Sequence, residues 1–466
     1  MNILLVLPKD RIYFYKGKLT NNIGYAPLTL TVLAGLVPEE LNADIELIDE
    51  GVQEHRFTDK HYDIVGITCV ASTCKRAYML AEYYRSKGSH VVLGGVHPTL
   101  NPDEAQRHAD TVIVGMGEIE WPRFLRDFAG GMHKERYTHN NDREFNDREF
   151  NDSKFNDREF NDREFLDYPM PRRDLQPKSL YMPVPTVIAN RGCRNHCKFC
   201  SIHAMYHSKS LTRTLDNVVN EIKQLKSRQI LFLDPSPLSD RTYAMAFFKA
   251  ITPLRIKWMG LTTGDVVYDE ELFNAMVESG CTGVLVGFET FSQENNAQHG
   301  KGVNDVERYR EIVDRMHEHK ISVLGHFVVG FDGDTKESLS KMVDIIDDLN
   351  IDLPRFTILT PLPGTAFYDE MKKAGRIITD DYDLYDTEHV VFQPKHMMPE
   401  ELQALYIKIK TDANSFRHIF RRSMKSKNNR LITLVANIGI RFTQSNSKIL
   451  AIFCNIGLKI YSLFVR

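Results

Sequence analysis

Residues 191–203 read RGCRNHCKFCSIH and place three cysteines, Cys193, Cys197 and Cys200, in the spacing C-x3-C-x2-C. Three thiolates this close in sequence are expected to converge on one metal centre. Iron–sulfur clusters are normally held by four thiolates, so a set of three leaves one iron open for a small molecule. The missing fourth cysteine therefore predicts a cluster with an open ligand position.

A structural zinc site is the alternative that this motif alone leaves open. Zinc sites made of three cysteines and one histidine are common, and the fourth ligand would come from His196, His203 or His207. Phe199, directly before the last cysteine, fits the iron–sulfur interpretation better. The rest of the chain has to decide between the two metals.

Length, charge and cysteine usage narrow the class of protein. A chain of 466 residues predicts two or three domains. The net charge of −3 gives no sign of nucleic-acid binding. Seven cysteines in so long a chain do not form a disulfide framework, and a thiolate cluster needs a reducing compartment. The first ten residues, MNILLVLPKD, are too short an apolar run for a signal peptide and are predicted to be a strand. We therefore expect a cytoplasmic protein.

The first domain, residues 1–132, alternates short apolar runs with helical stretches. The runs NILLVLP, ADIELID, DIVGITCV, HVVLGGVH and TVIVGMGE are rich in Val and Ile, as strands buried on both faces are. Such β/α units predict a doubly wound, Rossmann-like parallel sheet, whose ligand lies beyond the carboxyl ends of the strands. The residues expected there are Thr68, Gly94, Gly95, His97, Gly115, Gly117 and Glu118.

Two stretches of this domain carry a family resemblance when they stand before the cysteine motif. LGGVHPTLNPDEA (93–105) and VGMGEIEWPRFL (114–125) resemble the cobalamin-binding domain that precedes many radical SAM enzymes. The resemblance implies that the seven strand-end residues contact cobalamin. The loop PKDRIYFYKGKLTNNIGYAP (8–27) lacks the D-x-H-x-x-G motif, which implies cobalt without a protein histidine below it. For His97 a structural turn histidine before Pro98 is an equal alternative.

A repeat separates the first domain from the second. Residues 141–165 consist of NDREF units, one of them NDSKF. A phenylalanine at every fifth position forms no stripe on a helix or a strand. Low hydrophobicity and excess acidic residues favour a flexible linker, residues 133–166, without a catalytic role.

Residues 167–365 hold a second β/α series with six candidate strands, TVIANRG, ILFLD, IKWMGLTT, GVLVGFET, ISVLGHFVVGF and RFTILTP. The cysteine motif, which resembles the cluster motif of radical SAM enzymes, directly follows the first of them. That resemblance implies a partial (β/α)6 barrel and a [4Fe–4S] cluster whose open iron chelates S-adenosylmethionine. It also implies contacts with S-adenosylmethionine from Phe199, Arg213, Asp234, Thr263, Glu289 and Gly330.

These contacts have structural alternatives. Asp234 is expected near the amino group of S-adenosylmethionine but could cap a turn, and Glu289 is expected near the ribose but could pair with a lysine. The glycines could serve only to shape turns. No side chain is assigned as a general acid or base.

The end of the chain differs in composition. Residues 366–415 are predicted to form an accessory subdomain. Residues 415–466 contain ten Lys and Arg and no Asp or Glu, between apolar runs. We expect 416–466 to be a basic amphipathic helical tail on an anionic membrane surface, with packing on the protein's own core as the alternative. This expectation places the protein in the cytoplasm, peripheral at the inner membrane face.

Together, the two resemblances predict a cobalamin-dependent radical SAM enzyme, most simply a methyltransferase of an unactivated carbon. A lipophilic or small-molecule substrate is expected, and the basic, apolar tail suggests a membrane-resident one. The stretches TPLPGT (360–365) and YDLYDTEHVVFQPKHMMPEEL (382–402) also resemble a branch of this family that includes enzymes acting on hopanoids. The electron donor would be a reductase or a protein of flavodoxin or ferredoxin type. Alternatives are ring formation or rearrangement without methylation, a zinc-stabilised binding module, and a first domain that serves only for interaction.

Overall fold

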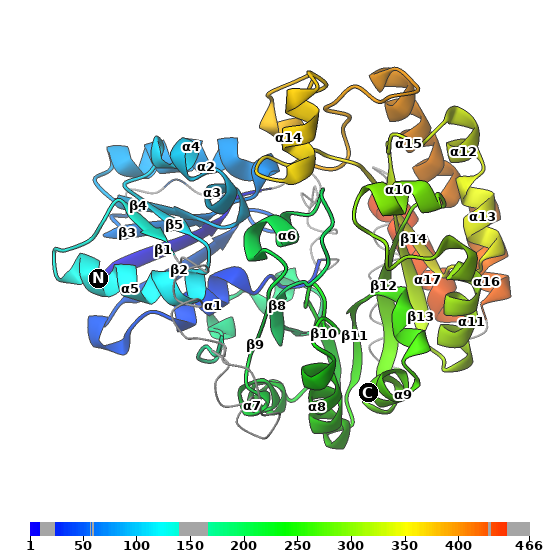
Figure 1. Cartoon of the computed structure of the whole chain (residues 1–466). Helices are drawn as coiled ribbons and strands as arrows, with labels where there is room; N and C mark the ends of the chain where they lie inside the picture. Colours follow the sequence, from blue (N-terminus) through cyan, green and yellow to red (C-terminus); the bar gives the residue numbers. More distant parts are fainter. Residues whose placement is uncertain (10–23, 56, 58–59, 139–165, 427–429, 445–466) are drawn as a thin grey trace, which may run out of the picture.

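The computed structural model describes residues 1–9, 24–55, 57, 60–138, 166–426 and 430–444. Over these residues the chain forms two parallel sheets that lie side by side, with the helices after residue 398 on the outer side of the second (Figure 1). Most of the loop after the first strand, the NDREF repeat and the last apolar run of the tail lie outside the described residues.

The first sheet confirms the predicted doubly wound domain. Its strand order is β2-β1-β3-β4-β5-β6, and every pair is parallel. The apolar runs are buried on both faces, because helices cover each side. The last strand lies beyond the predicted boundary at residue 132 and pairs with β5, so the sheet reaches Thr138. The strands are β1 (Asn2–Leu7), β2 (Asp44–Asp49), β3 (Ile64–Thr68), β4 (His90–Gly94), β5 (Thr111–Val114) and β6 (Arg136–Thr138).

Two sets of helices cover this sheet. On one face, α1 and α5 contribute Leu30, Trp121 and Phe124 to a buried core, and on the other α2 contributes Ala77 and Leu80. Two short helices, α3 and α4, follow β4 and precede β5. The bounds are α1 (Thr29–Gly35), α2 (Cys74–Ser86), α3 (Val96–Leu100), α4 (Pro102–Gln106) and α5 (Gly117–Ala129).

The second sheet confirms the predicted partial barrel. It has six parallel strands in the order β14-β13-β12-β11-β10-β7. Helices α7 to α13 pack around it and enclose the largest core of the described chain. The strands are β7 (Thr186–Val187), β10 (Gln229–Phe232), β11 (Lys257–Thr262), β12 (Cys281–Glu289), β13 (Ser322–Val329) and β14 (Leu353–Ile358). The helices are α7 (Leu215–Leu225), α8 (Arg241–Ile251), α9 (Glu270–Glu278), α10 (Gln293–Gln298), α11 (Tyr309–Glu318), α12 (Lys336–Ser340) and α13 (Met342–Asp348).

The prediction of a single strand at TVIANRG is wrong, because the structure divides this stretch into two strands, β7 and β8. Only β7 joins the barrel sheet, and β8 (Asn190–Gly192) pairs antiparallel with β9 (Ser210–Thr212). The cause lies at the break: the backbone N–H groups of Ala189 and Asn190 donate to the Asp234 carboxylate, at 2.9 and 2.5 Å, instead of extending the ladder. The resulting hairpin carries the cysteine loop between its strands.

The end of the chain packs on the barrel. Helix α14 (Ala366–Lys373) follows the last barrel strand, and α15 (Pro399–Ala413) buries Leu402 and Tyr406 in the barrel core. Helices α16 (Phe416–Lys425) and α17 (Arg430–Gln444) form a hairpin against α13 and α15. Of the helices that the structure describes, none has the length and hydropathy to cross a membrane.

Candidate cofactor site at the seam of two sheets

The three motif cysteines lie on the loop between β8 and the short helix α6 (Ser201–Tyr206). Cys197 is buried, and Cys193 and Cys200 are partly exposed. A second segment braces this loop: the backbone N–H of Lys198 donates to the carbonyl of His299 at 3.1 Å, and the Cys197 sulfur lies 3.9 Å from the carbonyl of Gly300. The loop therefore presents its thiols at the carboxyl end of the first barrel strand, where the sequence predicts them.

The surroundings of the thiols shift their pKa values in opposite directions. Burial raises the pKa of Cys200, but backbone N–H groups of His203 and Ile202, at the start of α6, donate to its sulfur and lower that pKa. Burial raises the pKa of Cys197 to about 11, and the Lys301 ammonium opposes this rise. Burial is the larger effect at both cysteines, so both pKa values stay above their usual range and binding of the metal would have to release the thiol protons.

The zinc alternative fits this geometry less well. A tetrahedral zinc would hold its thiolate sulfurs about 3.8 Å apart. Such a site also needs a fourth ligand, for which the sequence offers His196, His203 or His207. The ring nitrogens Nδ1 of His196 and His203 instead lie 2.8 and 3.0 Å from the Ser208 hydroxyl.

Glu289 forms the polar centre of the barrel mouth. It ends β12 with a backbone φ of 64°, a value that non-glycine residues rarely adopt. One carboxylate oxygen lies 3.0 Å from the Lys301 ammonium and the other 3.1 Å from Nδ1 of His326 on β13. Burial would raise the pKa of Glu289, but the charge of Lys301 and the bond with His326 together lower it to about 2. The lysine pairing considered for Glu289 is therefore present.

Lys301 and His326 are site residues that the sequence analysis missed. Lys301 is largely buried and its charge reaches the cluster cysteines as well as Glu289. His326 continues the network, since its Nε2 lies 3.3 Å from the Thr357 hydroxyl on β14. A lysine twelve residues after a strand-end acid was the only local signal that could have indicated this network.

Asp234 lies at the carboxyl end of β10, as predicted. It is 1% exposed, and one carboxylate oxygen accepts the two N–H groups that break the first strand. The other oxygen, Oδ2, is buried without a hydrogen-bond partner among the described residues. Burial raises the pKa of Asp234 to about 7 against the lowering by the backbone bonds. An orphaned oxygen at this edge fits a ligand with a donor group, and the contact with S-adenosylmethionine stays a prediction.

Arg213 is buried among structural partners. Its guanidinium bonds Glu221 at 2.6 Å, the carbonyl of Ile188 at 2.8 Å and the Tyr168 hydroxyl at 3.0 Å. It also bonds Asn217 at 2.7 Å. These bonds explain why a basic residue is needed before α7, and the predicted contact with S-adenosylmethionine is untested.

The remaining predicted S-adenosylmethionine residues lie around the same mouth. Phe199 packs against Phe331, with ring centroids 6.1 Å apart. Gly330 follows β13 with a φ of 105°, and its N–H donates to Asp334 at 2.8 Å. Thr263 follows β11 directly. Cys193, Cys197, Cys200, Asp234, Thr263, Glu289 and Gly330 therefore all occupy one end of the barrel.

Four of the predicted cobalamin residues come together at the carboxyl edge of the first sheet. Thr68, Gly94 and Gly115 follow from neighbouring strands, and Gly95 has a φ of 99° that brings its α-carbon against the Thr68 hydroxyl. A Cβ at Gly94 would meet nothing closer than Ile113 at 3.8 Å, and one at Gly117 nothing closer than Leu33 at 3.4 Å. Both glycines are partly exposed and a Cβ at either would make an ordinary van der Waals contact with the protein, so the predicted approach of cobalamin at this edge stays a prediction.

His97 and Glu118 have protein partners instead. The His97 side chain is 1% exposed, with its Nε2 3.5 Å from Glu104 and its ring 5.3 Å from that of Tyr382. Its Nε2 has no hydrogen-bond partner among the described residues, so the structure does not show a satisfied turn histidine, and cofactor contact stays a prediction. Glu118 pairs across the two domains with Arg191, at 2.7 Å.

This ion pair lies in the contact region between the carboxyl edges of the two sheets. We call this region the seam; it also includes Leu100, Asn101, Pro363 and Gly364. The Asn101 amide lies 3.5 Å from the carbonyl of Pro363, and a Cβ at Gly364 would lie 2.6 Å from that of Leu100. In Figure 1, α6 lies between the two sheets, on the side of the second that faces the first. The cysteine loop and the glycine edge thus belong to one site.

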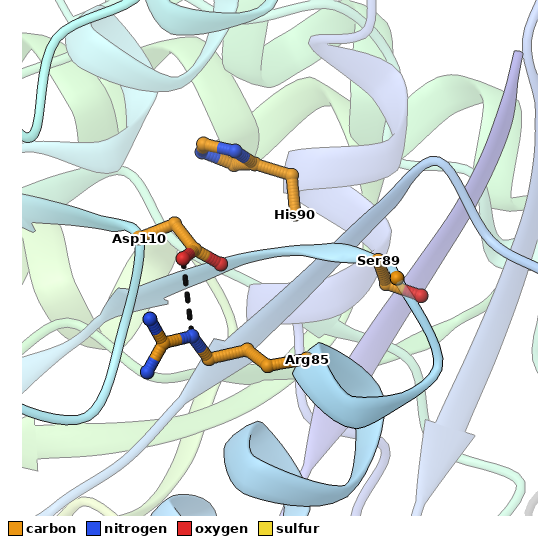
Figure 2. Close-up of a pocket in the computed structure, with 5 residues that line it drawn as sticks. Arg85, Ser89, His90 and Asp110 are labelled. Carbon is orange, nitrogen blue, oxygen red and sulfur yellow. Dashed lines mark hydrogen bonds and ion pairs between the residues drawn. The ribbon is translucent and has the colours of Figure 1, made fainter.

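A pocket in the first domain lies at the opposite edge. Its lining includes Arg85, Ser89, His90 and Asp110, and Arg85 pairs with Asp110 at 3.0 Å (Figure 2). His90 starts β4, whereas Gly94 ends it. The pocket therefore lies at the amino ends of the strands, away from the expected cofactor edge.

Comparison with known families identifies both halves of this site. Residues 187–346 match the radical SAM superfamily, and residues 25–125 match the B12-binding domain. The chain is thus a radical SAM enzyme with a domain for cobalamin. It belongs to the cobalamin-dependent radical SAM enzymes, and its cofactors are a [4Fe–4S] cluster, S-adenosylmethionine and cobalamin. The zinc-stabilised binding module and the first domain as a mere interaction module are not supported.

Curated relatives and solved structures agree with this assignment. The bacteriochlorophyllide d C-12(1)-methyltransferase of Chlorobaculum tepidum is 28% identical over 90% of this chain and 89% of its own. The C-8(2)-methyltransferase of the same organism is 27% identical over 89% and 91%. The radical SAM methyltransferase TsrM from Kitasatospora setae, solved with cobalamin and a [4Fe–4S] cluster, shares the fold with a TM-score of 0.60 at 18% identity, over 80% of this chain and 75% of its own.

Proposed function

We propose that this enzyme transfers a methyl group to an unactivated carbon of a lipophilic small molecule. The carrying observation is that relatives named as methyltransferases align with about nine-tenths of the chain, across both domains and the seam. When bound, the cluster and S-adenosylmethionine supply a radical that removes hydrogen, and cobalamin supplies the methyl group.

The protein's own residues orient and enclose this chemistry. Cys193, Cys197 and Cys200 would hold the cluster, and the Glu289–Lys301 pair would fix a polar ligand group in the barrel mouth. Gly94 and Gly95 would let cobalamin approach the backbone, and the Arg191–Glu118 pair would hold the two cofactor edges in register. Exclusion of water from this seam protects reactive species from side reactions.

For the substrate we propose a tetrapyrrole-type macrocycle in preference to a hopanoid. The hopanoid C-2 methylase of Rhodopseudomonas palustris is 23% identical over only 46% of this chain, whereas the two bacteriochlorophyllide d methyltransferases align over almost all of it. We further propose a one-electron donor of flavodoxin or ferredoxin type and a reducing, cytoplasmic setting, because thiolate ligands need one.

Ring formation without methylation is the second candidate. A specific observation favours it: the anaerobic magnesium-protoporphyrin IX monomethyl ester cyclase of Rubrivivax gelatinosus is 21% identical over 86% of this chain.

Product mass separates the two. The reconstituted enzyme is incubated anaerobically with a chlorophyllide-type macrocycle, a reductant and S-adenosylmethionine carrying a deuterated methyl group. Methylation predicts a product with the labelled methyl on carbon. A product that gains no labelled carbon would contradict the methyltransferase proposal and favour the cyclase.

A further inference from the structure

The hairpin of α16 and α17 exposes an apolar stripe. Phe416, Phe420 and Met424 are 58%, 62% and 49% exposed, and Leu431 at the start of α17 is 69% exposed. The first three are spaced four residues apart, so they lie on one face of α16. Large side chains gathered on one exposed face mark an interaction surface rather than scattered surface residues.

The other face of the hairpin is firmly anchored. Arg422 is fully buried and bonds Asp347 at 3.0 Å, Asn437 at 3.0 Å and the carbonyl of Ala413 at 2.6 Å. A second arginine, Arg441 of α17, donates to the carbonyl of Asn414 and so ties the two helices together. The hydrogen bonds of Arg422 fix which face of α16 packs against the protein. The stripe lies on the opposite, solvent-exposed face.

The stripe is accompanied by positive charge. Residues 415–444 contain seven Lys and Arg and no Asp or Glu. Arg417 and Arg430 are exposed. The Lys425 ammonium instead donates to the carbonyl of Asp347 on α13, at 3.2 Å. Arg421 pairs with Asp348 of α13 at 2.7 Å, so the neighbouring acids are already engaged. Aromatic and aliphatic side chains among basic ones match an anionic membrane surface, with apolar groups at the acyl boundary and cations at the phosphates.

We propose that this face, Phe416, Phe420, Met424 and Leu431 with Arg417 and Arg430, docks on an anionic lipid bilayer. A second copy of the chain is a poor occupant, because two such basic faces would repel each other. The sequence after residue 444 is again apolar and basic and contains no acid. In Figure 1 the hairpin lies on the side of the barrel away from the first domain, so docking leaves the cofactor seam free. The proposal is independent of the substrate.

Vesicle sedimentation of the full reconstituted chain tests it. We expect the wild-type protein to sediment with phosphatidylglycerol-containing vesicles, more weakly at high salt, and not with pure phosphatidylcholine. The double variant Phe416→Ser/Phe420→Ser should lose binding at least about tenfold. The matched control Met79→Ser/Met132→Ser removes side chains exposed by 60% and 70% on the first domain and should bind as the wild type does.

Thermal unfolding checks that both variants remain folded, which the exposure of the substituted side chains leads us to expect. No sedimentation of the wild type, equal sedimentation with neutral vesicles, or full binding by Phe416→Ser/Phe420→Ser would each overturn the proposal.

Discussion

Glu289 is a buried carboxylate that is kept ionised by two neighbours from different elements. Lys301 comes from the loop after α10, and His326 from β13. Because sequence spacing cannot show which side chains meet across barrel strands, Glu289 could be predicted from its place at a strand end but its network could not. The three cysteines differ from Glu289 in this respect. They lie within eight residues of one another, so the spacing C-x3-C-x2-C was sufficient to predict them as ligands of one metal centre.

Replacing one member of the Glu289–Lys301 pair should lower the free energy of unfolding more than replacing both. Glu289→Gln leaves the Lys301 ammonium buried beside a neutral amide, a loss of about 3–5 kcal/mol. The double variant Glu289→Gln/Lys301→Met should lie much closer to the wild type. Urea unfolding of the three proteins at neutral pH measures this, and equal losses in the single and double variants would contradict a coupled pair.

The same pair gives a pH dependence of defined sign. The pKa of Glu289 falls from 4.5 to about 2 on folding. Its contribution to stability is therefore complete above pH 4.5 and is lost as the pH falls towards 2. Over this range the free energy of unfolding should fall more steeply for the wild type than for Glu289→Gln/Lys301→Met. Identical slopes would show that Glu289 is not held in its ionised form.

Asp234 should behave in the opposite way. Its pKa rises from 3.8 to about 7, so its neutral form is favoured and stability is lost as the pH rises through 7. Asp234→Asn keeps a carbonyl oxygen for the two N–H donors and removes the buried charge. We expect the variant to be more stable than the wild type at pH 8 and nearly equal at pH 4, by thermal unfolding without cofactors. A destabilised variant at pH 8 would mean that the ionised carboxylate has a favourable partner.

At the scale of elements, the segment from α10 to Lys301 supports the cysteine loop. Gly300 has a φ of 73°, and a Cβ there would collide with the carbonyl of His196. Gly302, two residues on, would meet nothing within 4 Å. The two glycines form a matched pair for testing this support.

Gly300→Ala should disturb the cysteine loop, whereas Gly302→Ala should not. Strain of this kind costs about 1–3 kcal/mol, and displacement of His196 should lower the iron content after reconstitution. Iron analysis and thermal unfolding of both variants provide the measurement. Iron content in Gly300→Ala equal to that in Gly302→Ala would rule out the bracing role.

The elements themselves were largely predictable. Strands buried on both faces give continuous apolar runs, so both parallel sheets could be located from the sequence. The break between β7 and β8 could not, since it depends on Asp234, 44 residues away along the chain from Asn190. The partners of Arg213 could not be predicted for the same reason, since Tyr168 and Glu221 meet it only in the folded chain. Its predicted contact with S-adenosylmethionine stays a prediction.

At the scale of the whole molecule, the seam brings the cysteine loop of the barrel next to the glycine-bearing strand ends of the first domain. Arg191 and Glu118 are 25% and 11% exposed, whereas the second ion pair across the domains, Lys75 with Asp381, is 48% and 43% exposed. Sequence patterns locate the carboxyl edge of each sheet, but they carry no information on how the two edges contact each other. Glu118 was therefore expected at cobalamin, and its partner was not expected.

Glu118→Gln should weaken the coupling of the two domains, because Arg191 loses its charged partner in a partly buried setting. Calorimetry should show a broader or split transition. Asp381→Asn breaks an exposed pair, worth at most about 1 kcal/mol, and should leave one transition. Equal effects of the two substitutions would contradict the role assigned to the Arg191–Glu118 pair.

The central claim is that one chain holds a three-cysteine iron–sulfur cluster and cobalamin at a common seam. The most direct measurement is the iron and cobalamin content, with visible spectra, after anaerobic reconstitution of the wild type, Cys197→Ser and the control Cys281→Ser, whose buried cysteine lies on β12. We predict both cofactors in the wild type and the control, and cobalamin with little iron in Cys197→Ser. A wild-type protein that retains no cobalamin, or a Cys197→Ser variant that keeps its full iron content, would contradict the account.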